Sequence, residues 1–154
     1  WEEDAVKPDL IITAGSFADC ESLEEIYYRH SQIVDKSKPV FKKLDYKEAS
    51  LAKYAINTYL ASKVVFMNQL YQLYSDIYMG KTRPQDWENF VDAISMDPRI
   101  GSSHLMVPGH DGKMGYGGTC FPKDVRGLIG VDSKGRLSVL REVSEVNTKL
   151  RLLK

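Results

Sequence analysis

The sequence has few cysteines and no excess of charge of either sign. Its two cysteines, Cys20 and Cys120, lie a hundred residues apart and cannot form the closely spaced pairs of a zinc site, so we expect reduced thiols and no metal. Lys and Arg total 21, and so do Asp and Glu, which removes any general argument for binding nucleic acid or a membrane surface. The acidic start, residues 1–4, lacks the basic region of a signal peptide and lacks methionine, which favours a cytoplasmic location and a fragment of a longer chain.

Glycine and proline are absent from residues 44 to 79, which predicts one long helix from about Tyr46 to Tyr78. Lys63 is the only charged residue between Lys53 and Asp76, yet that charge and several amide side chains argue against a membrane span. Apolar residues cover most of the helix circumference, so the helix must be buried on both sides, in a core or against a second subunit. We favour a subunit interface, and thus a homodimer formed through helix 46–78, with an interface that includes Tyr59, Phe66, Leu70 and Tyr74.

The first thirty residues predict one strand followed by one helix. Residues 8–15 are a short apolar run bounded by Pro and Gly, as in a buried strand. Asp19 or Ser22 is the candidate N-cap of a helix that ends near His30. One strand and one helix cannot bury themselves, so they resemble the last strand-helix unit of a larger sheet.

The remaining chain is predicted to be helical apart from two connections. Residues 34–44 are interpreted as a solvated basic linker, with a possible extended piece at 39–43. A helix opens at 83–86, where a proline lies near its first position. Residues 97–120 hold two prolines and six glycines, and a loop of that length is usually functional or disordered. A final amphipathic helix is expected at about 137–153.

The stretch GYGGTCFPKD at residues 115–124 places a cysteine at the expected start of a helix. The positive end of the helix dipole and the charge of Lys123 both favour the thiolate of Cys120, which is the nucleophilic form. The glycines before it allow backbone N–H groups to approach a ligand closely. The alternative is an unreactive cysteine that serves as a small buried hydrophobic residue.

Four other residues could take part in the chemistry of a site, although each also has an ordinary structural interpretation. Lys53 and Asn57 stand four apart on one helix face, where both could reach one oxyanion or could simply lie on the surface. Asp124 could be an acid that complements the helix dipole. Arg99 lies in the long loop and could meet an anionic ligand or water. A dinucleotide fingerprint is not supported, because no G-x-G-x-x-G follows a strand in this sequence.

Three ordered segments resemble the nucleotide-sugar dehydrogenase family, which includes UDP-glucose and GDP-mannose 6-dehydrogenases. They are EASLAKYAINTYLASKVVFMNQL at 48–70, MDPRIG at 96–101 and GGTCFPKD at 117–124. The resemblance implies a mainly α fold: a central helical domain, similar to the C-terminal domain of 6-phosphogluconate dehydrogenase, with a long dimerisation helix. It assigns residues 1–34 to the end of an NAD-binding Rossmann domain and residues 35–154 to the substrate-binding and dimerisation domain.

The resemblance also implies a reaction in which NAD oxidises a sugar alcohol to a carboxylate in two steps. Cys120 matches the family's nucleophile, which forms a thiohemiacetal and then a thioester. Lys53 and Asn57 match residues that bind the substrate and stabilise oxyanions, and Asp124 matches the acid that activates water. The residues matched to the remaining ligand contacts are Arg99, Tyr116 and Gly117 for the sugar nucleotide and Lys123 for the cofactor.

The sugar nucleotide and the catalytic state of the chain stay open at this point. Residues 104–114 are longer and more polar than in shorter family members, so their ligand contacts cannot be assigned. We favour UDP-glucose, with GDP-mannose as the alternative. Most of the NAD site would lie outside the chain, so we expect no activity from the chain alone. The other hypotheses are a non-catalytic module for dimerisation and sugar-nucleotide binding, and an unrelated helical interaction protein.

Overall fold

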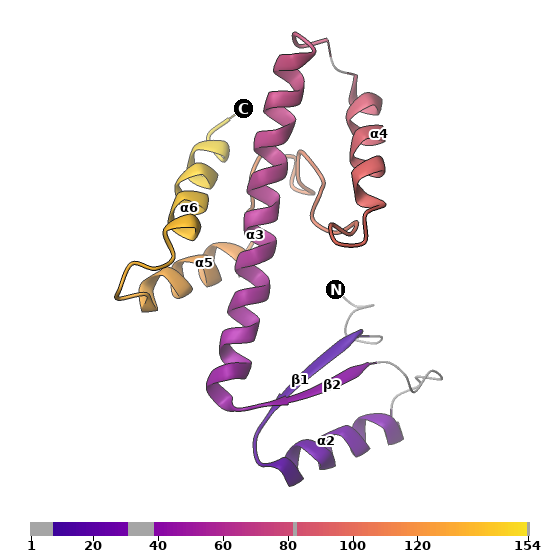
Figure 1. Ribbon diagram of the computed structural model, residues 1–154, viewed down its shortest axis with the longest axis vertical. Coiled ribbons are helices and arrows are strands. Elements are labelled where there is room, and N and C mark those ends of the chain that lie inside the picture. The colour runs from indigo at the N-terminus through magenta and orange to yellow at the C-terminus, as the bar shows by residue number, and fades with distance from the viewer. Residues whose placement is uncertain (1–7, 31–38, 82, 154) are drawn as a thin grey trace. The chain divides into compact units, whose positions relative to one another are not determined.

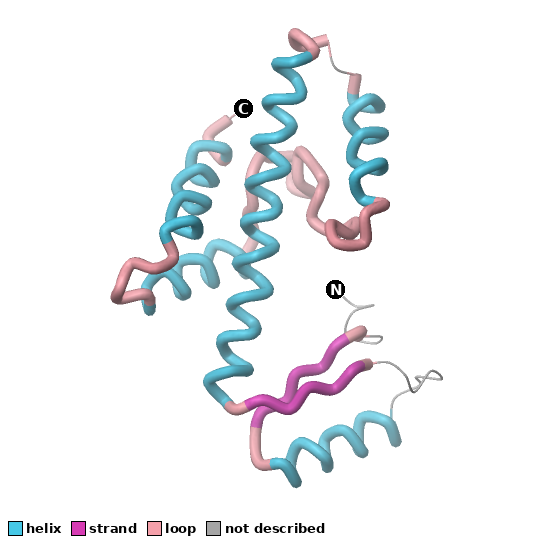
Figure 2. Tube along the Cα trace, in the orientation of Figure 1, coloured by secondary structure: helices cyan, strands magenta, loops and turns pink. Residues whose placement is uncertain are grey.

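The computed structural model describes residues 8–30, 39–81 and 83–153. They form two compact units, one ending at Lys53 and the other beginning at Tyr54 (Figures 1 and 2). Most of the described residues are helical, and two short strands form one parallel sheet, so the predicted mainly α fold class is confirmed. The assignment of 1–34 and 35–154 to separate domains stays a prediction.

The first unit is a strand-helix-strand element followed by the start of a long helix. Strand β1 (Leu10–Ala14) pairs in parallel with β2 (Val40–Leu44), and their registers run from Leu10 opposite Val40 to Ala14 opposite Leu44. Helix α2 (Phe17–His30) connects them and packs on β2, where the ring of Phe41 lies 5.6 Å from that of Tyr27 and 5.4 Å from that of Tyr28. The helix also buries Cys20.

One prediction for this unit was wrong and a second was partly right. Neither Asp19 nor Ser22 caps α2, because the Ser16 hydroxyl oxygen accepts the N–H of Asp19 at 3.2 Å and the helix begins at Phe17. The possible extended piece at 39–43 is confirmed as strand β2, whereas the interpretation of these residues as a solvated linker was wrong, because the partner strand β1 satisfies their backbone groups. The part of the linker at 34–38 lies outside the described residues.

Helix α3 (Tyr46–Ile77) has clear start and stop signals. At its start the Asp45 carboxylate accepts the N–H groups of Lys47 and Glu48, and the Glu48 carboxylate accepts the N–H of Asp45 at 3.2 Å. At its end Gly80 adopts φ +69°, and its N–H reaches back to the carbonyl of Ser75 at 2.9 Å. The predicted boundaries of 46 and about 78 are therefore confirmed.

In the second unit, α3 lies between two hydrophobic clusters. Helix α4 (Pro84–Ser95) begins with Pro84 in its first turn, as predicted, and its apolar side chains pack against one side of α3. The buried members of this cluster are Met67, Trp87, Leu105 and Val107.

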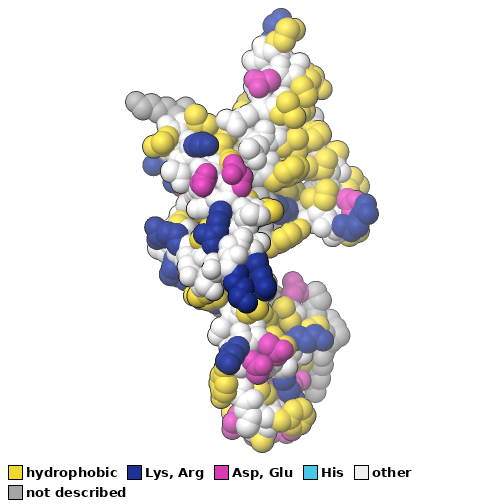
Figure 3. Space-filling model, turned by 60° about the vertical axis from the view of Figure 1, so that its left-hand side comes forward, with side chains coloured by type: hydrophobic (Ala, Val, Ile, Leu, Met, Phe, Trp, Pro, Cys, Tyr) yellow, Lys and Arg dark blue, Asp and Glu magenta, His cyan; other side chains and the backbone are white. Residues whose placement is uncertain are grey.

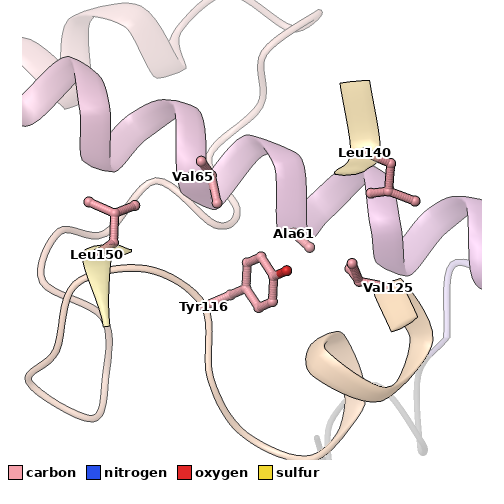
Figure 4. Close-up of a cluster of buried hydrophobic side chains, with 6 residues drawn as sticks. All are labelled: Ala61, Val65, Tyr116, Val125, Leu140 and Leu150. Carbon is pink, nitrogen blue, oxygen red and sulfur yellow. The ribbon is translucent and has the colours of Figure 1, made fainter. Parts of the chain in front are cut away.

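The second cluster joins α3 to α5 (Cys120–Val131) and α6 (Ser138–Leu150). In Figure 4 the ring of Tyr116, at the end of the long loop, points toward Ala61 of α3 and Val125 of α5. Leu140 and Leu150 of α6 complete the cluster. The start of the glycine run, Gly115 and Tyr116, is thus buried among helices that come from distant parts of the sequence.

These clusters leave one stripe of α3 uncovered. Tyr59, Phe66, Leu73 and Ile77 are between 55% and 69% exposed. The first three are spaced seven residues apart, which places them on one face of the helix. Figure 3 shows hydrophobic side chains gathered on the surface of the upper part of the molecule, which is the second unit. Two sides of the apolar surface of α3 are therefore covered within the chain, one by α4 and the other by α5 and α6.

Candidate functional site

Cys120 is the first residue of α5, and its thiol is partly exposed. The Thr119 hydroxyl lies 3.8 Å from its sulfur. Cys120 thus stands in the first turn of α5, at the positive end of the helix dipole. The predicted location of Cys120 at a helix start is confirmed, whereas its role as a nucleophile stays a prediction.

Asp124 lies one turn after Cys120 and is completely buried. Its carboxylate accepts a hydrogen bond of 2.5 Å from the side-chain amide of Asn57, which comes from α3. The other carboxylate oxygen contacts the ammonium of Lys123, whose side chain is 57% exposed. This hydrogen bond raises the pKa of Lys123. A buried carboxylate, an amide donor and an ammonium thus meet beside the partly exposed thiol.

Lys53 lies one turn before Asn57 on α3 and is exposed. The boundary between the two compact units falls directly after it, so Lys53 belongs to the first unit and Asn57 to the second. Its predicted contact with the substrate stays a prediction.

Arg99 stands on a tight turn after α4 and is 88% exposed. Asp97 holds it in two ways: its carboxylate accepts the backbone N–H at 2.9 Å and the guanidinium at 2.6 Å. These hydrogen bonds raise the pKa of Arg99 and lower that of Asp97. The guanidinium is thereby fixed near the surface, where an anionic ligand could reach it.

Lys63, which the sequence did not single out as a site residue, supports the same turn. Its ammonium donates to the carbonyl of Ile100 at 2.8 Å, and the carbonyl of Gly101 lies at 3.4 Å. Burial lowers the pKa of Lys63, and burial together with the Lys63 charge lowers that of His104 nearby. The signal available in the sequence was a single charge in the middle of a long uncharged helix.

A pocket of about 320 Å³ lies between α3, α4 and this turn. Apolar side chains form most of its wall, including Phe66, Ile94 and Leu105, and Lys63 and Arg99 contribute charge. Cys120 is not among the described residues that line it. The pocket and the thiol are therefore separate features of the second unit.

Tyr116 and Gly117 lie on the run that leads to Cys120, but their surroundings are crowded. The Tyr116 side chain is 5% exposed in the core, and burial raises its pKa. Gly117 is covered by the guanidinium of Arg151, because a Cβ added at Gly117 would lie 2.9 Å from it. Arg151 in turn pairs with Asp111 of the long loop at 2.8 Å. Their predicted contacts with a sugar nucleotide stay predictions.

Two buried asparagines were also missed as part of the site. Asn68 accepts the N–H of Gly115 at 2.8 Å, and Asn147 accepts the N–H of Tyr116 at 2.7 Å. Both occur as single amides on otherwise apolar helix faces, a pattern that does not reveal their partners.

The described residues offer neither a metal site nor a membrane span. Within residues 8–30, 39–81 and 83–153, no three His, Cys, Asp or Glu side chains are grouped so that they could hold a metal ion. None of the helices in this part of the chain combines the length and apolar character needed to cross a bilayer.

Comparisons with known proteins agree on one family. The model of the UDP-glucose/GDP-mannose dehydrogenase family, central domain, matches residues 47–149. A UDP-glucose 6-dehydrogenase of Pseudomonas aeruginosa is 31% identical over 98% of this chain and 31% of its own length. One from Haloferax volcanii is 32% identical over 82% of this chain and 27% of its own.

A solved structure shows the same fold. The UDP-glucose dehydrogenase of the hyperthermophilic archaeon Pyrobaculum islandicum superposes with a TM-score of 0.68 at 27% identity, covering 97% of this chain and 30% of that one. The chain thus spans about a third of the length of these relatives. It belongs to the UDP-glucose/GDP-mannose dehydrogenase family, and residues 47–149 match the central domain of that family.

Proposed function

We propose that this chain carries the thiol centre of an NAD-dependent nucleotide-sugar 6-dehydrogenase that acts on UDP-glucose. The observation that supports this most is the arrangement of Cys120 at the start of α5 with the buried Asp124 one turn later and Asn57 bonded to it. The relatives' names, which give UDP-glucose as the substrate, favour that sugar nucleotide.

The proposed chemistry uses the thiol as a covalent nucleophile. The Cys120 sulfur attacks the carbonyl carbon of the sugar aldehyde and gives a thiohemiacetal. Asn57 and Lys53 stabilise the oxyanion that develops. Hydride transfer to a nicotinamide cofactor would convert the sugar's primary alcohol to this aldehyde and, in a second transfer, the thiohemiacetal to a thioester. Water that adds to the thioester carbonyl would then expel the Cys120 sulfur, giving the carboxylate and the free thiol. Asp124 accepts the proton of that water.

The oxidations need a hydride acceptor, and NAD is the one that the family resemblance implies. The described residues do not fit a dinucleotide site, because the turn from β1 to α2 contains only Gly15 and Ser16 and no G-x-G-x-x-G. Lys123, the predicted cofactor contact, pairs with Asp124.

Arg99 is the proposed phosphate-binding residue, together with backbone contacts at Tyr116 and Gly117. Its exposed guanidinium has the planar donor geometry that suits a phosphate. Asp97 and Lys63 fix the turn on which it stands. The same groups would serve GDP-mannose, which remains the second candidate.

Substrate protection of the thiol tests this proposal. UDP-glucose should slow the alkylation of Cys120 by iodoacetamide about tenfold or more, because a bound sugar covers a nucleophile that touches it. Cys20, only 2% exposed, is the internal control and should react slowly whether or not the ligand is present. Peptide mass spectrometry reads both thiols, and GDP-mannose is run in parallel.

Arg99→Ala should weaken this protection by UDP-glucose, whereas free glucose should not protect at all. If GDP-mannose protects Cys120 and UDP-glucose does not, GDP-mannose replaces UDP-glucose as the proposed substrate. Labelling of Cys120 that is indifferent to both sugar nucleotides would contradict the proposal.

We expect the purified 154-residue chain to form no NADH from UDP-glucose. The reason is that its sequence has no dinucleotide fingerprint after a strand. Absorbance at the NADH band, with Cys120→Ser as the blank, checks this. Saturable formation of NADH above that blank would show that the residues present do build a cofactor site.

We also propose that the chain forms a homodimer through α3 and acts in the cytoplasm. The stripe of Tyr59, Phe66, Leu73 and Ile77 is the surface that we assign to the interface. Exposed apolar surface of this extent on one helix commonly marks a protein interface, and a two-fold dimer is the commonest closed solution. Leu70 and Tyr74, in contrast, pack against the α4 cluster of their own chain.

A further inference from the structure

A single amide satisfies both backbone polar groups of Tyr116. The Asn147 oxygen accepts the Tyr116 N–H at 2.7 Å, and the Asn147 nitrogen donates to the Tyr116 carbonyl at 3.1 Å. Asn147 is 8% exposed, so water cannot replace these bonds at low cost. The amide carries its acceptor and its donor on two neighbouring atoms, so one side chain can serve both backbone groups.

The neighbouring residue is held in the same way from a different helix. Asn68, completely buried in α3, accepts the Gly115 N–H at 2.8 Å and donates to the carbonyl of Val64 at 2.8 Å. Gly115 adopts φ +73°, and a Cβ there would lie 2.5 Å from the Asn147 oxygen. Asn147 can approach the backbone this closely only because residue 115 has no side chain. We call the two hydrogen bonds between Asn147 and Tyr116 the clamp.

The clamp fixes one end of the segment 116–120, which leads to the Cys120 thiol. Between Tyr116 and Cys120 lie Gly117, Gly118 and Thr119, and the last two are exposed. Glycine loses more conformational freedom on folding than any other residue, so this segment has little order of its own. The other end is fixed at α5, where Asp124 bonds to Asn57.

We propose that Asn147 is a positioning residue for Cys120, with Asn68 as its counterpart on α3. It acts through the backbone of Tyr116 and keeps the Cys120 thiol in the first turn of α5. The inference deepens the proposed function, since it rests on Cys120 being the nucleophile. It predicts that the accessibility of the Cys120 thiol depends on the amide of Asn147, in the last turn of α6.

The test compares two maleimides of different size on the Cys20→Ser protein. Both reagents attack the thiolate, so the thiolate fraction cancels from the ratio of their rates. N-methylmaleimide is the small reagent and N-(1-pyrenyl)maleimide the bulky one. The clamped, partly exposed thiol should discriminate against the bulky reagent.

Asn147→Asp makes the clamp dependent on pH. The protonated carboxyl group can still accept from Tyr116 N–H and donate to its carbonyl, but the carboxylate cannot donate. Below the pKa of the introduced group the rate ratio should equal the parent value. Above it the discrimination should fall about tenfold, the effect expected from losing one buried hydrogen bond.

Two further variants separate positioning from charge and from loss of fold. Thr148→Asp adds a carboxylate at the next, exposed position of α6 and should leave the ratio unchanged. Asn147→Ser removes the clamp without adding a charge near Arg151, and it should show reduced discrimination at every pH. Circular dichroism checks that each protein is folded. If Asn147→Asp does not fold, the rate ratio of Asn147→Ser alone tests the inference.

Unchanged discrimination in folded Asn147→Ser would overturn the inference. The rate ratio needs no substrate, so this outcome leaves the proposed function standing. Conversely, absence of protection by UDP-glucose would defeat the proposed function without altering the ratio.

Discussion

Gly115→Ala should destabilise the protein by about 3 kcal/mol, adding ~1–2 kcal/mol for a left-handed backbone to ~1–3 kcal/mol for overpacking. Gly115 is buried at φ +73°, and the new methyl group would lie 2.5 Å from the Asn147 oxygen and 3.2 Å from Leu150 Cβ. Neither neighbour can move freely, because the Asn147 amide is hydrogen-bonded to both backbone groups of Tyr116 and Leu150 is buried in the core. Urea unfolding followed by circular dichroism measures the loss.

Gly118→Ala is the matched control for this substitution. Gly118 has nearly the same backbone angle, φ +75°, but a Cβ there meets no heavy atom within 4 Å. It should therefore cost only the backbone contribution of about 1 kcal/mol. Equal losses for the two variants would mean that the contact with Asn147 contributes nothing to the cost at Gly115.

Phe66→Asp should convert the proposed dimer into a folded monomer. Phe66 lies at the middle of the exposed stripe on α3 and is 61% exposed in the single chain, so a charge there is tolerated in the monomer. In the dimer the same charge would be buried without a partner, at a cost of about 3 kcal/mol or more. Sedimentation velocity at micromolar concentration should show the mass halved with the helix content retained.

Gln72→Asp provides the control for that charge. Gln72 is exposed on α3 but lies about 100° around the helix from Leu73 and thus off the stripe. This variant should sediment like the parent protein. A parent that sediments as a folded monomer, or a Phe66→Asp protein that stays dimeric, would rule out the assigned interface.

The long helices could be predicted because their signals are local. The absence of glycine and proline over 44–79, followed by Gly80, gives the bounds of α3, and Pro84 gives the start of α4. Strand β2 was predicted only as a possible extended piece within a linker, because its five residues include Lys42 and Lys43 and its pairing with β1 has no local signal. The α2 cap was misplaced because Ser16, Asp19 and Ser22 are all good capping residues.

The same distinction applies to the candidate site. Cys120, Asp124 and Asn57 stand in recognisable segments, and the structure places Asn57 and Asp124 in contact although 67 residues separate them. The partners of the supporting groups Lys63 and Asn147 have no local signature, because they are backbone atoms 31 to 38 residues away. Such contacts depend on how the helices pack, which a residue pattern does not specify.

The hydrogen bonds to Asn147 have a consequence during synthesis of the chain. When residue 131 has been added to the growing chain, the cysteine, its glycines and the whole of α5 have been synthesised, yet the amide that pairs with Tyr116 has not been made. Asn147 lies in the last turn of α6, so the backbone leading to the thiol acquires its final partners only when that helix is complete and docked. The final ordering of the segment that leads to Cys120 is thereby postponed until α6 has been synthesised and has folded against it.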